Sequence, residues 1–373
     1  MRKLKSVLPI LISIPLLVGC WDRIEINDLA FVIASGIDMK GIDKYNVSVQ
    51  VALPSAMGGT GSSGGGGGTS GGPYYVDAEP GRNIRESNDN LQLRLSRNLY
   101  FAHRRVLIIG EKLAREGINE ALNVVLTQPQ SRLSTFVLIS KGEAINILKT
   151  KTKLDLLPGE ALREMSKSNI GMTVKDALQD MNRYGKEAVI PVVEKGKGGF
   201  KMDSFAIMRH DKVAFFTNKK ESGGVLWLRN KMNEKSITFS DAKKQEITLR
   251  IIESGVKPEF SMVNGKPLFT FKVIATGTLM ENEGNMDLAR PRIYSRVVKE
   301  FQQEVRSEIM SLIKHSHSEG IDVAGLGWYL YRSRNNLWDE RFKENWEENL
   351  HNLDVKVVVD GEILRMTNTG WNY

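Results

Sequence analysis

Cysteine and histidine are scarce in this 373-residue sequence, which contains one cysteine, Cys20, and five histidines. A single cysteine excludes an intramolecular disulfide and any zinc site built from several thiolates. No HExxH or Walker sequence is present, so the chain lacks the local signatures of a zinc protease and of a P-loop nucleotide-binding protein. The usual sequence signals of a metal or nucleotide site are therefore missing.

Long apolar runs are also absent, and the longest lies at the N-terminus. Residues 1–20 read MRKLKSVLPILISIPLLVGC, with three basic residues before the apolar run Val7–Val18. That run is shorter than the ~20 apolar residues needed to span a bilayer, and it contains two prolines. A basic start followed by a short apolar run is typical of a secretory signal. We therefore expect residues 1–19 to be a signal peptide rather than a transmembrane helix.

The end of this leader, Leu17–Cys20, reads LVGC and resembles the bacterial lipobox. The resemblance implies that Cys20 becomes the first residue of the mature protein and carries an S-diacylglyceryl group and an N-acyl group. Because Cys20 is the only cysteine, lipidation also explains why an exported chain would keep a single thiol. Two or more acyl chains suffice for stable anchoring, whereas one does not. We expect a protein that is held at a membrane without crossing it.

A strong excess of one charge is lacking as well. The formal net charge is +8, and removing the leader with Arg2, Lys3 and Lys5 leaves about +5. The remaining basic residues alternate with acidic ones, as in KENWEEN near the C-terminus, and do not form one long basic run. Nucleic-acid binding is therefore not expected, whereas a mild attraction to an anionic membrane explains the excess.

Strand and helix patterns alternate through residues 20–195, which predicts a mixed α/β N-terminal domain. Leu29–Asp38 and Tyr45–Leu53 are expected to form a β-hairpin, and helices are expected over Asn83–Leu99, Leu113–Leu126 and Pro158–Ser168. The tract Gly58–Gly72 holds no lysine, so it does not match a phosphate-binding loop and is interpreted as a flexible insertion.

The small and basic residues Lys195–Gly199 are expected to separate this domain from a second one over residues 200–373. Three long strands are expected near 246–256, 266–275 and 277–282, with a last strand from Leu353. The apolar positions of Arg292–His317 keep to one helical face and predict the longest helix. The sequence thus predicts an α+β fold whose C-terminal half has a largely antiparallel sheet. A subdivision near 285–290 is left open.

Candidate chemistry is sparse. His103, His210 and His351 are isolated in sequence, and His315 and His317 are two positions apart, so they face different ways on a helix. Acid pairs such as Glu347–Glu348 and Asp339–Glu340 are interpreted as solvated helix faces. Trp338 and Trp346 are spaced to pack in a core rather than to bind a sugar. We therefore predict no catalytic, cofactor or metal site, and Cys20 is the one site residue assigned.

Several motifs in order resemble the Ger(x)C family of spore germination lipoproteins. They are Cys20-Trp21-Asp22 with Glu25, RNLYFAHRRVLIIGEKLAREGI from Arg97, ESGGVLWLRNK from Glu221, GTLMEN from Gly277, and DVAGLGWYLYR from Asp322. The chain departs from the family in the long glycine tract and in Ala324, where a phenylalanine is more usual.

The resemblance implies the C subunit of a nutrient germinant receptor, on the outer face of the spore inner membrane beside an A and a B subunit. We expect a non-catalytic role in assembly with these subunits. Two alternatives stay open, a solute-binding lipoprotein that captures the nutrient directly and a lipid-anchored cell-wall hydrolase. A capturing protein should have a ligand-sized cleft between lobes, with convergent polar groups.

Overall fold

The computed structural model describes residues 25–41, 44–53, 72–241 and 243–364. The expected signal peptide, Cys20 and residues 58–71 of the glycine tract lie outside this part of the chain. Within the described residues, no helix has both the length and the apolar character needed to cross a membrane.

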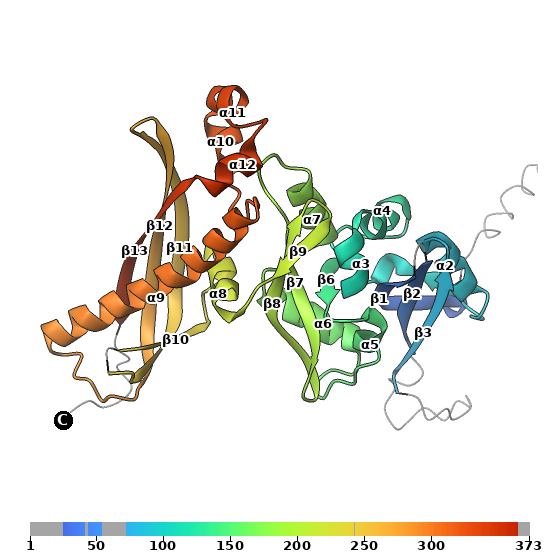
Figure 1. Ribbon diagram of the computed structural model, residues 1–373. Coiled ribbons are helices and arrows are strands. Elements are labelled where there is room, and N and C mark those ends of the chain that lie inside the picture. The colour runs from blue at the N-terminus through green and yellow to red at the C-terminus, as the bar shows by residue number, and fades with distance from the viewer. Residues whose placement is uncertain (1–24, 42–43, 54–71, 242, 365–373) are drawn as a thin grey trace, which may run out of the picture.

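A nine-stranded mixed sheet forms the N-terminal lobe (Figure 1). Eight strands follow the order β3-β2-β1-β5-β6-β7-β8-β9, and β4 pairs with β1. The strands are β1 (Leu29–Gly41), β2 (Lys44–Ala52), β3 (Tyr74–Gly81), β4 (Asn98–Tyr100), β5 (Val106–Gly110), β6 (Phe136–Ser140), β7 (Val189–Gly196), β8 (Gly199–Arg209) and β9 (Lys212–Phe216). Strands β1, β5, β6 and β7 are parallel in the centre, and antiparallel strands flank them. The predicted β1–β2 hairpin is confirmed.

Helices cover both faces of this sheet, because its central strands are apolar on both sides. Ile109 and Ile139 pack with helices α3, α4 and α7, whereas Ile108 and Leu138 pack with α5 and α6 on the other face. The elements of the lobe are η2 (Ile26–Asp28), α2 (Ile84–Gln92), η4 (Phe101–His103), α3 (Glu111–Glu116), α4 (Asn119–Thr127), α5 (Ala144–Leu148), α6 (Pro158–Ser168) and α7 (Val174–Met181).

Two predicted helices differ from the structure. The helix expected over Asn83–Leu99 ends at Gln92, and β4 follows it. The helix expected over Leu113–Leu126 is broken by Gly117, whose φ of 147° no helix accommodates. The helix over Pro158–Ser168 is confirmed. The breaks show that apolar spacing alone does not mark where a helix stops.

Lys195–Gly199, the expected separator, contains the turn between β7 and β8. Strands β8 and β9 pair with β7 and with each other, so the first sheet continues to Phe216. A short run of glycine and lysine is compatible with a hairpin turn as much as with a linker.

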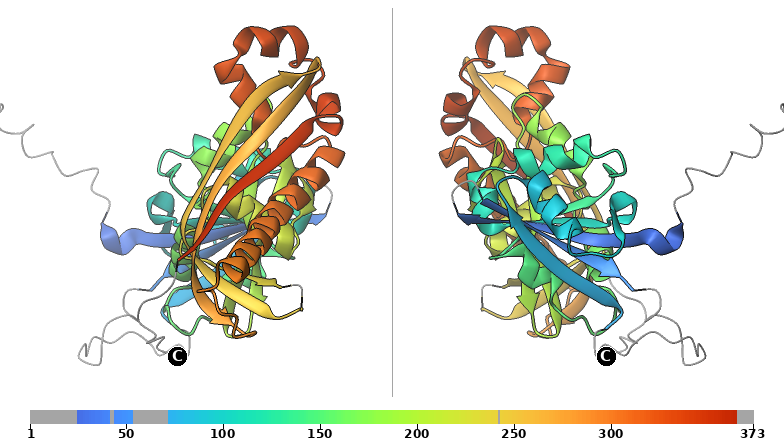
Figure 2. Two further views of the ribbon diagram at one scale, coloured as in Figure 1. Left: turned by 90° about the vertical axis from the view of Figure 1, so that its left-hand side faces the viewer. Right: turned by 90° about the vertical axis from the view of Figure 1, so that its right-hand side faces the viewer.

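The C-terminal lobe is a four-stranded sheet of order β10-β11-β12-β13, with the long helix α9 along one face (Figures 1 and 2). Pairing is antiparallel except between β12 and β13. The elements are α8 (Lys219–Leu228), β10 (Ser236–Ser240), β11 (Glu246–Val263), β12 (Lys266–Asn282), α9 (Pro291–Ser318), α10 (Leu326–Ser333), α11 (Asn335–Arg341), α12 (Trp346–His351) and β13 (Asp354–Leu364). The predicted long helix and last strand are confirmed.

The sequence predicted two separate strands where this sheet has one, and that prediction is wrong. The strands expected at 266–275 and 277–282 form one continuous β12, and β11 extends to Val263. The turn between β11 and β12 is confined to Asn264 and Gly265, which both have positive φ. Such a two-residue turn suits the twist of the flanking strands, so the hairpin is longer than the sequence pattern indicates.

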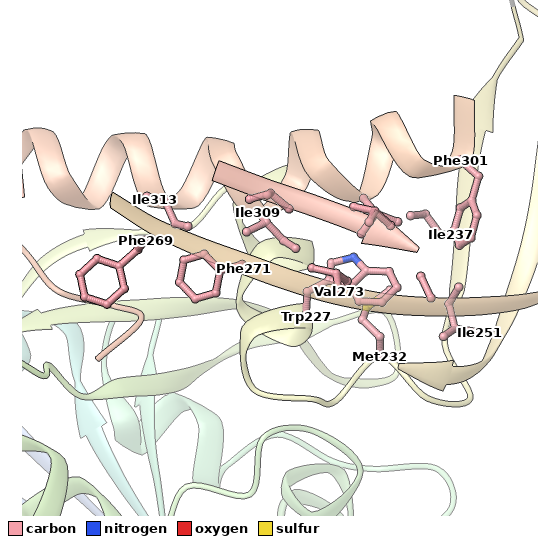
Figure 3. Close-up of a cluster of buried hydrophobic side chains, with 14 of the residues drawn as sticks. Trp227, Met232, Ile237, Ile251, Phe269, Phe271, Val273, Phe301, Ile309 and Ile313 are labelled. Carbon is pink, nitrogen blue, oxygen red and sulfur yellow. The ribbon is translucent and has the colours of Figure 1, made fainter. Parts of the chain in front are cut away.

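The core of the C-terminal lobe lies between α9 and the sheet. Figure 3 shows Phe271, Ile309 and Trp227 gathered there. The predicted apolar face of α9 is confirmed, since Val297, Phe301 and their neighbours on this face are buried. The α+β class predicted from the sequence is confirmed, with a mixed first lobe and a largely antiparallel second sheet.

The two lobes are joined by helix α8. Its Gly223 and Gly224 lie against α9, where an added Cβ would come within 2.4 Å of Glu308 Cδ and 2.6 Å of Glu308 O, respectively. Val225 of α8 also belongs to an apolar cluster with Phe205 of β8 and Ile321. The glycine contact lies inside the second lobe, whereas the cluster of Val225, Phe205 and Ile321 is an apolar contact between the lobes.

Candidate functional site

A polar cleft of about 440 Å³ lies between the lobes. The end of α7, the segment between α7 and β7 and the β8–β9 turn form one wall, and α12 with the segments before α10 and before α12 forms the other. Its lining includes Tyr184, Lys186, Glu187, His210, Asp322, Trp346 and Glu347. The volume is in the range of small-molecule sites.

Two glycines let the walls approach each other. Gly185 has a φ of +55°, and a Cβ added to it would come within 2.6 Å of Gly327 Cα. A Cβ on Gly327 would in turn lie 2.7 Å from Gly185 Cα. The Trp328 backbone N–H donates to Gly185 O at 3.2 Å. Main chain therefore meets main chain at the base of the cleft, and any side chain there would push the lobes apart.

Asp322 fixes the start of α10 beside this contact. Its buried carboxylate accepts backbone N–H bonds from Gly325 at 2.7 Å, Leu326 at 2.9 Å and Gly327 at 2.7 Å. It also accepts the indole N–H of Trp346 at 3.1 Å. Complete burial raises the pKa of Asp322 to about 6, although these four hydrogen bonds act to lower it. The carboxylate thus ties the first residues of α10, whose N-cap is Gly325, to Trp346 of α12.

Three ionisable side chains meet at the mouth of the cleft. The His210 backbone N–H donates to Glu187 Oε2 at 2.9 Å. The His210 ring lies 3.6 Å from Glu187 Oε1 through Nδ1 and 3.8 Å from Glu347 Oε1 through Nε2. Burial raises the pKa of Glu187 to about 7. Glu187 can therefore take up or release a proton near neutral pH.

Three cationic side chains cluster around one carboxylate next to the cleft wall that contains Glu187. Buried Asp180 of α7 is shared by Arg183 at 3.0 Å, Lys186 at 2.6 Å and Arg229 at 3.3 Å. Burial lowers the pKa of Lys186, and Arg229 acts in the same direction. One carboxylate faces three cations, so this wall has an excess of positive charge, whereas the mouth carries the carboxylates of Glu187 and Glu347.

The structure places the histidines singled out from the sequence at separate positions. His315 contacts Glu221 at 2.8 Å through Nδ1 and stacks on Phe215, whereas His317 is buried. Burial lowers the pKa of His317 to about 4. Among residues 25–41, 44–53, 72–241 and 243–364, no group of three or more His, Cys, Asp or Glu side chains could hold a metal ion.

The tryptophans and acid pairs singled out from the sequence are placed as well. Trp338 and Trp346 are buried and meet edge to face with ring centroids 5.3 Å apart, so their predicted core role is confirmed. Glu347 lies at the cleft, and Asp339 pairs with Lys343 at 3.5 Å. Sequence reasoning missed Glu187 and Asp322. For Asp322 a signal existed, an aspartate shortly before a helical segment, whereas Glu187 has no local signal.

Two family models match the chain. The spore germination protein N-terminal domain matches residues 22–195. The spore germination B3/GerAC-like C-terminal domain matches residues 203–367. Together the two models account for nearly the whole sequence after the expected leader.

Relatives and a solved structure agree with this match. The YfkR protein of Bacillus subtilis (strain 168) is 32% identical over 366 residues, covering 95% of this chain and 94% of that protein. Spore germination protein KC of the same organism is 30% identical over 393 residues, covering 98% and 96%. The crystal structure of the GerBC protein is 21% identical and covers 89% of this chain and 98% of that one with a TM-score of 0.59, which shows a shared fold.

Proposed function

Because the chain belongs to the spore germination protein family described by these two domain models, we propose that it is a non-catalytic subunit of a spore germinant receptor, anchored by lipid at Cys20. The family match over both lobes carries this proposal and supports a role in spore germination. Location at the outer face of the spore inner membrane and assembly with an A and a B subunit are parts of the same proposal.

The lipid anchor is supported by the sequence of the leader. LVGC ends a short apolar run after three basic residues, and Cys20 is the only thiol in the chain. Replacing Cys20 with alanine should abolish fatty-acid labelling and weaken the retention of the protein at membranes. A mutant that still incorporates labelled fatty acid would contradict the anchor.

The non-catalytic role is supported by the composition of the cleft. Its lining residues include no serine, threonine or cysteine, so the cleft lacks the nucleophile of a serine-, threonine- or cysteine-type hydrolase. Assembly is tested by co-purification. The full-length protein should bring the A and B subunits with it from solubilised spore membranes, and a Cys20→Ala variant tests whether the anchor is needed. Isolation of the protein alone under conditions that preserve the A–B contact would contradict the assembly role.

The cleft favours one alternative, direct capture of the nutrient. It has the size of a small-molecule site, and its lining includes Lys186, whose ammonium pairs with Asp180, together with the carboxyl groups of Glu187 and Glu347. Such a charge arrangement fits a zwitterion, for example an amino acid. Calorimetry of the protein against a nutrient panel separates the two functions. Micromolar binding that Lys186→Met removes would favour capture, whereas no heat of binding would favour assembly alone.

A further inference from the structure

We propose that residues 149–157 and 195–198, called here the lysine–leucine surface, bind the anionic phospholipid surface of the membrane to which the chain is anchored. The inference rests on the proposed lipid anchor and adds the orientation that the anchored protein takes. It starts from exposed leucines that the fold does not use.

Leu154 and Leu156 project from the segment between α5 and α6. The exposed fraction of Leu154 is 98% and that of Leu156 is 68%. Leaving two leucines in water forgoes the free energy that burial would return. Two leucines this exposed, two positions apart in one segment, offer apolar surface to a second surface.

Exposed lysines lie in the same segment and in the adjoining turn. Lys149, Lys151 and Lys153 are exposed in the same segment, and Lys195 and Lys197 are exposed in the β7–β8 turn. The two segments touch, since a Cβ added to Gly198 would lie 2.7 Å from Lys153 Cε. Together they hold five lysines and a single acidic residue, Asp155.

The nearby carboxylates do not neutralise this charge. Glu194 and Asp203 both pair with Lys201, at 3.1 Å and 2.8 Å. Within the part of the chain that the structure describes, none of the five lysines of the surface forms an ion pair with a carboxylate. Leucines that enter the headgroup region beside lysines that meet phosphate are the pattern of an interfacial membrane contact.

The segment is held in place at both ends. The buried side chain of Gln50 donates to Leu148 O at 3.3 Å and accepts the Gly159 N–H at 2.8 Å. Inside the segment, the Thr152 hydroxyl donates to Asp155 O at 2.5 Å. A surface fixed in this way meets a membrane without first being ordered, which lowers the entropic cost of binding.

The surface also lies away from the cleft. Gly198 precedes β8, and His210 follows it, so the lysine–leucine surface and the mouth of the cleft are at opposite ends of this strand (Figure 1). An orientation with the lysine–leucine surface on the bilayer would therefore leave the cleft open to its surroundings.

The test uses the full-length lipidated protein in vesicles. Acylation blocks the Cys20 sulfur, so a cysteine introduced as Leu154→Cys is the one thiol that takes an environment-sensitive fluorophore. The matched control is Leu126→Cys on α4, which is also exposed. We expect a blue shift at position 154 in vesicles that contain phosphatidylglycerol and none in pure phosphatidylcholine, with no shift at position 126 in either.

A variant with two lysines neutralised measures how much the lysine charge contributes to membrane binding. Each lysine near an anionic surface contributes about 1 kcal/mol, or about 5-fold in partitioning. Lys151→Gln with Lys153→Gln should therefore weaken the contact at position 154 about 25-fold. Lys112→Gln with Lys175→Gln, two exposed lysines elsewhere, should leave the contact unchanged.

The outcomes separate this surface from the anchor. A position 154 that stays in water, or one that shifts equally in both lipids, overturns the proposal. So does a shift that needs added A and B subunits, because the surface would then bind protein. Fluorophore uptake by the parent chain would instead disprove acylation of Cys20. The surface would then be tested with the protein added to preformed vesicles.

Discussion

The indole Nε1 of Trp227 donates a 2.8 Å hydrogen bond to Oε2 of Glu308, which joins α8 to α9 inside the second lobe. Glu308 lies against Gly223 and Gly224 of α8, so its carboxylate sits where the two helices are closest. Burial raises the pKa of Glu308 to about 7. A group that stabilises the helix contact therefore changes its charge near neutral pH.

Replacing Glu308 with glutamine should remove part of the pH dependence of stability. The folded pKa is raised, so the protonated form contributes fully below the unfolded pKa of 4.5, and this contribution is lost as pH rises through about 7. The parent should lose about 2–3 kcal/mol more unfolding free energy than Glu308→Gln between mildly acidic and mildly alkaline pH. Denaturant unfolding across this window measures the difference. Glu340→Gln, at an exposed position, is the control, and parallel curves for the parent and Glu308→Gln would refute the assignment.

A methyl group at the base of the cleft should destabilise the contact between the lobes. In Gly327→Ala the new Cβ would meet Gly185 Cα at 2.7 Å and the Trp338 ring at 2.9 Å. We expect a loss of about 1–3 kcal/mol from overpacking. Gly255→Ala is the matched control, because nothing lies within 4 Å of its Cβ position. Equal melting temperatures for the two variants would show that the glycine contact does not limit how closely the lobes approach.

Loss of the Asp322 carboxylate should cost more than loss of one of its partners. Asp322→Ala leaves three buried backbone N–H groups and one indole without an acceptor, and we expect about 3–5 kcal/mol of destabilisation. Trp346→Leu removes one hydrogen-bond donor, but it also removes aromatic packing. Asp322→Asn keeps one oxygen acceptor and leaves that packing in place, so it is the cleaner comparison with Asp322→Ala. It should retain part of the stability. Chemical unfolding of the three variants checks this order, and an Asp322→Ala protein as stable as the parent would contradict it.

Deleting Gly58–Gly72 and closing the gap with a short turn should leave stability nearly unchanged. The flanking residues already meet, since the Leu53 N–H donates to Pro73 O at 2.9 Å. Loop-closure entropy varies slowly with length, by about 0.6 kcal/mol for each doubling. Thermal unfolding of the deletion variant is the measurement. A drop of many degrees would mean that the tract makes stabilising contacts.

Regular elements with strong periodicity were predictable from the sequence. The apolar face of α9 was predicted because its positions repeat with the helical period over 28 residues. The break at Gly117 was not, because the same apolar spacing continues on both sides of it. Pairing of β8 with β7 was also missed, since Lys195–Gly199 has the composition of a linker and only the partner strand makes it a turn.

The sequence by itself determined the family resemblance and the strands and helices with clear periodicity, and it carries the prediction of a leader and of a lipid site at Cys20. The tertiary structure alone decided the cleft. Gly185 and Gly327 are far apart in the chain, as are Glu187 and Glu347, and no local pattern links them. Their meeting depends on how the two lobes pack, and that packing is set by long-range burial of apolar surface rather than by neighbouring residues.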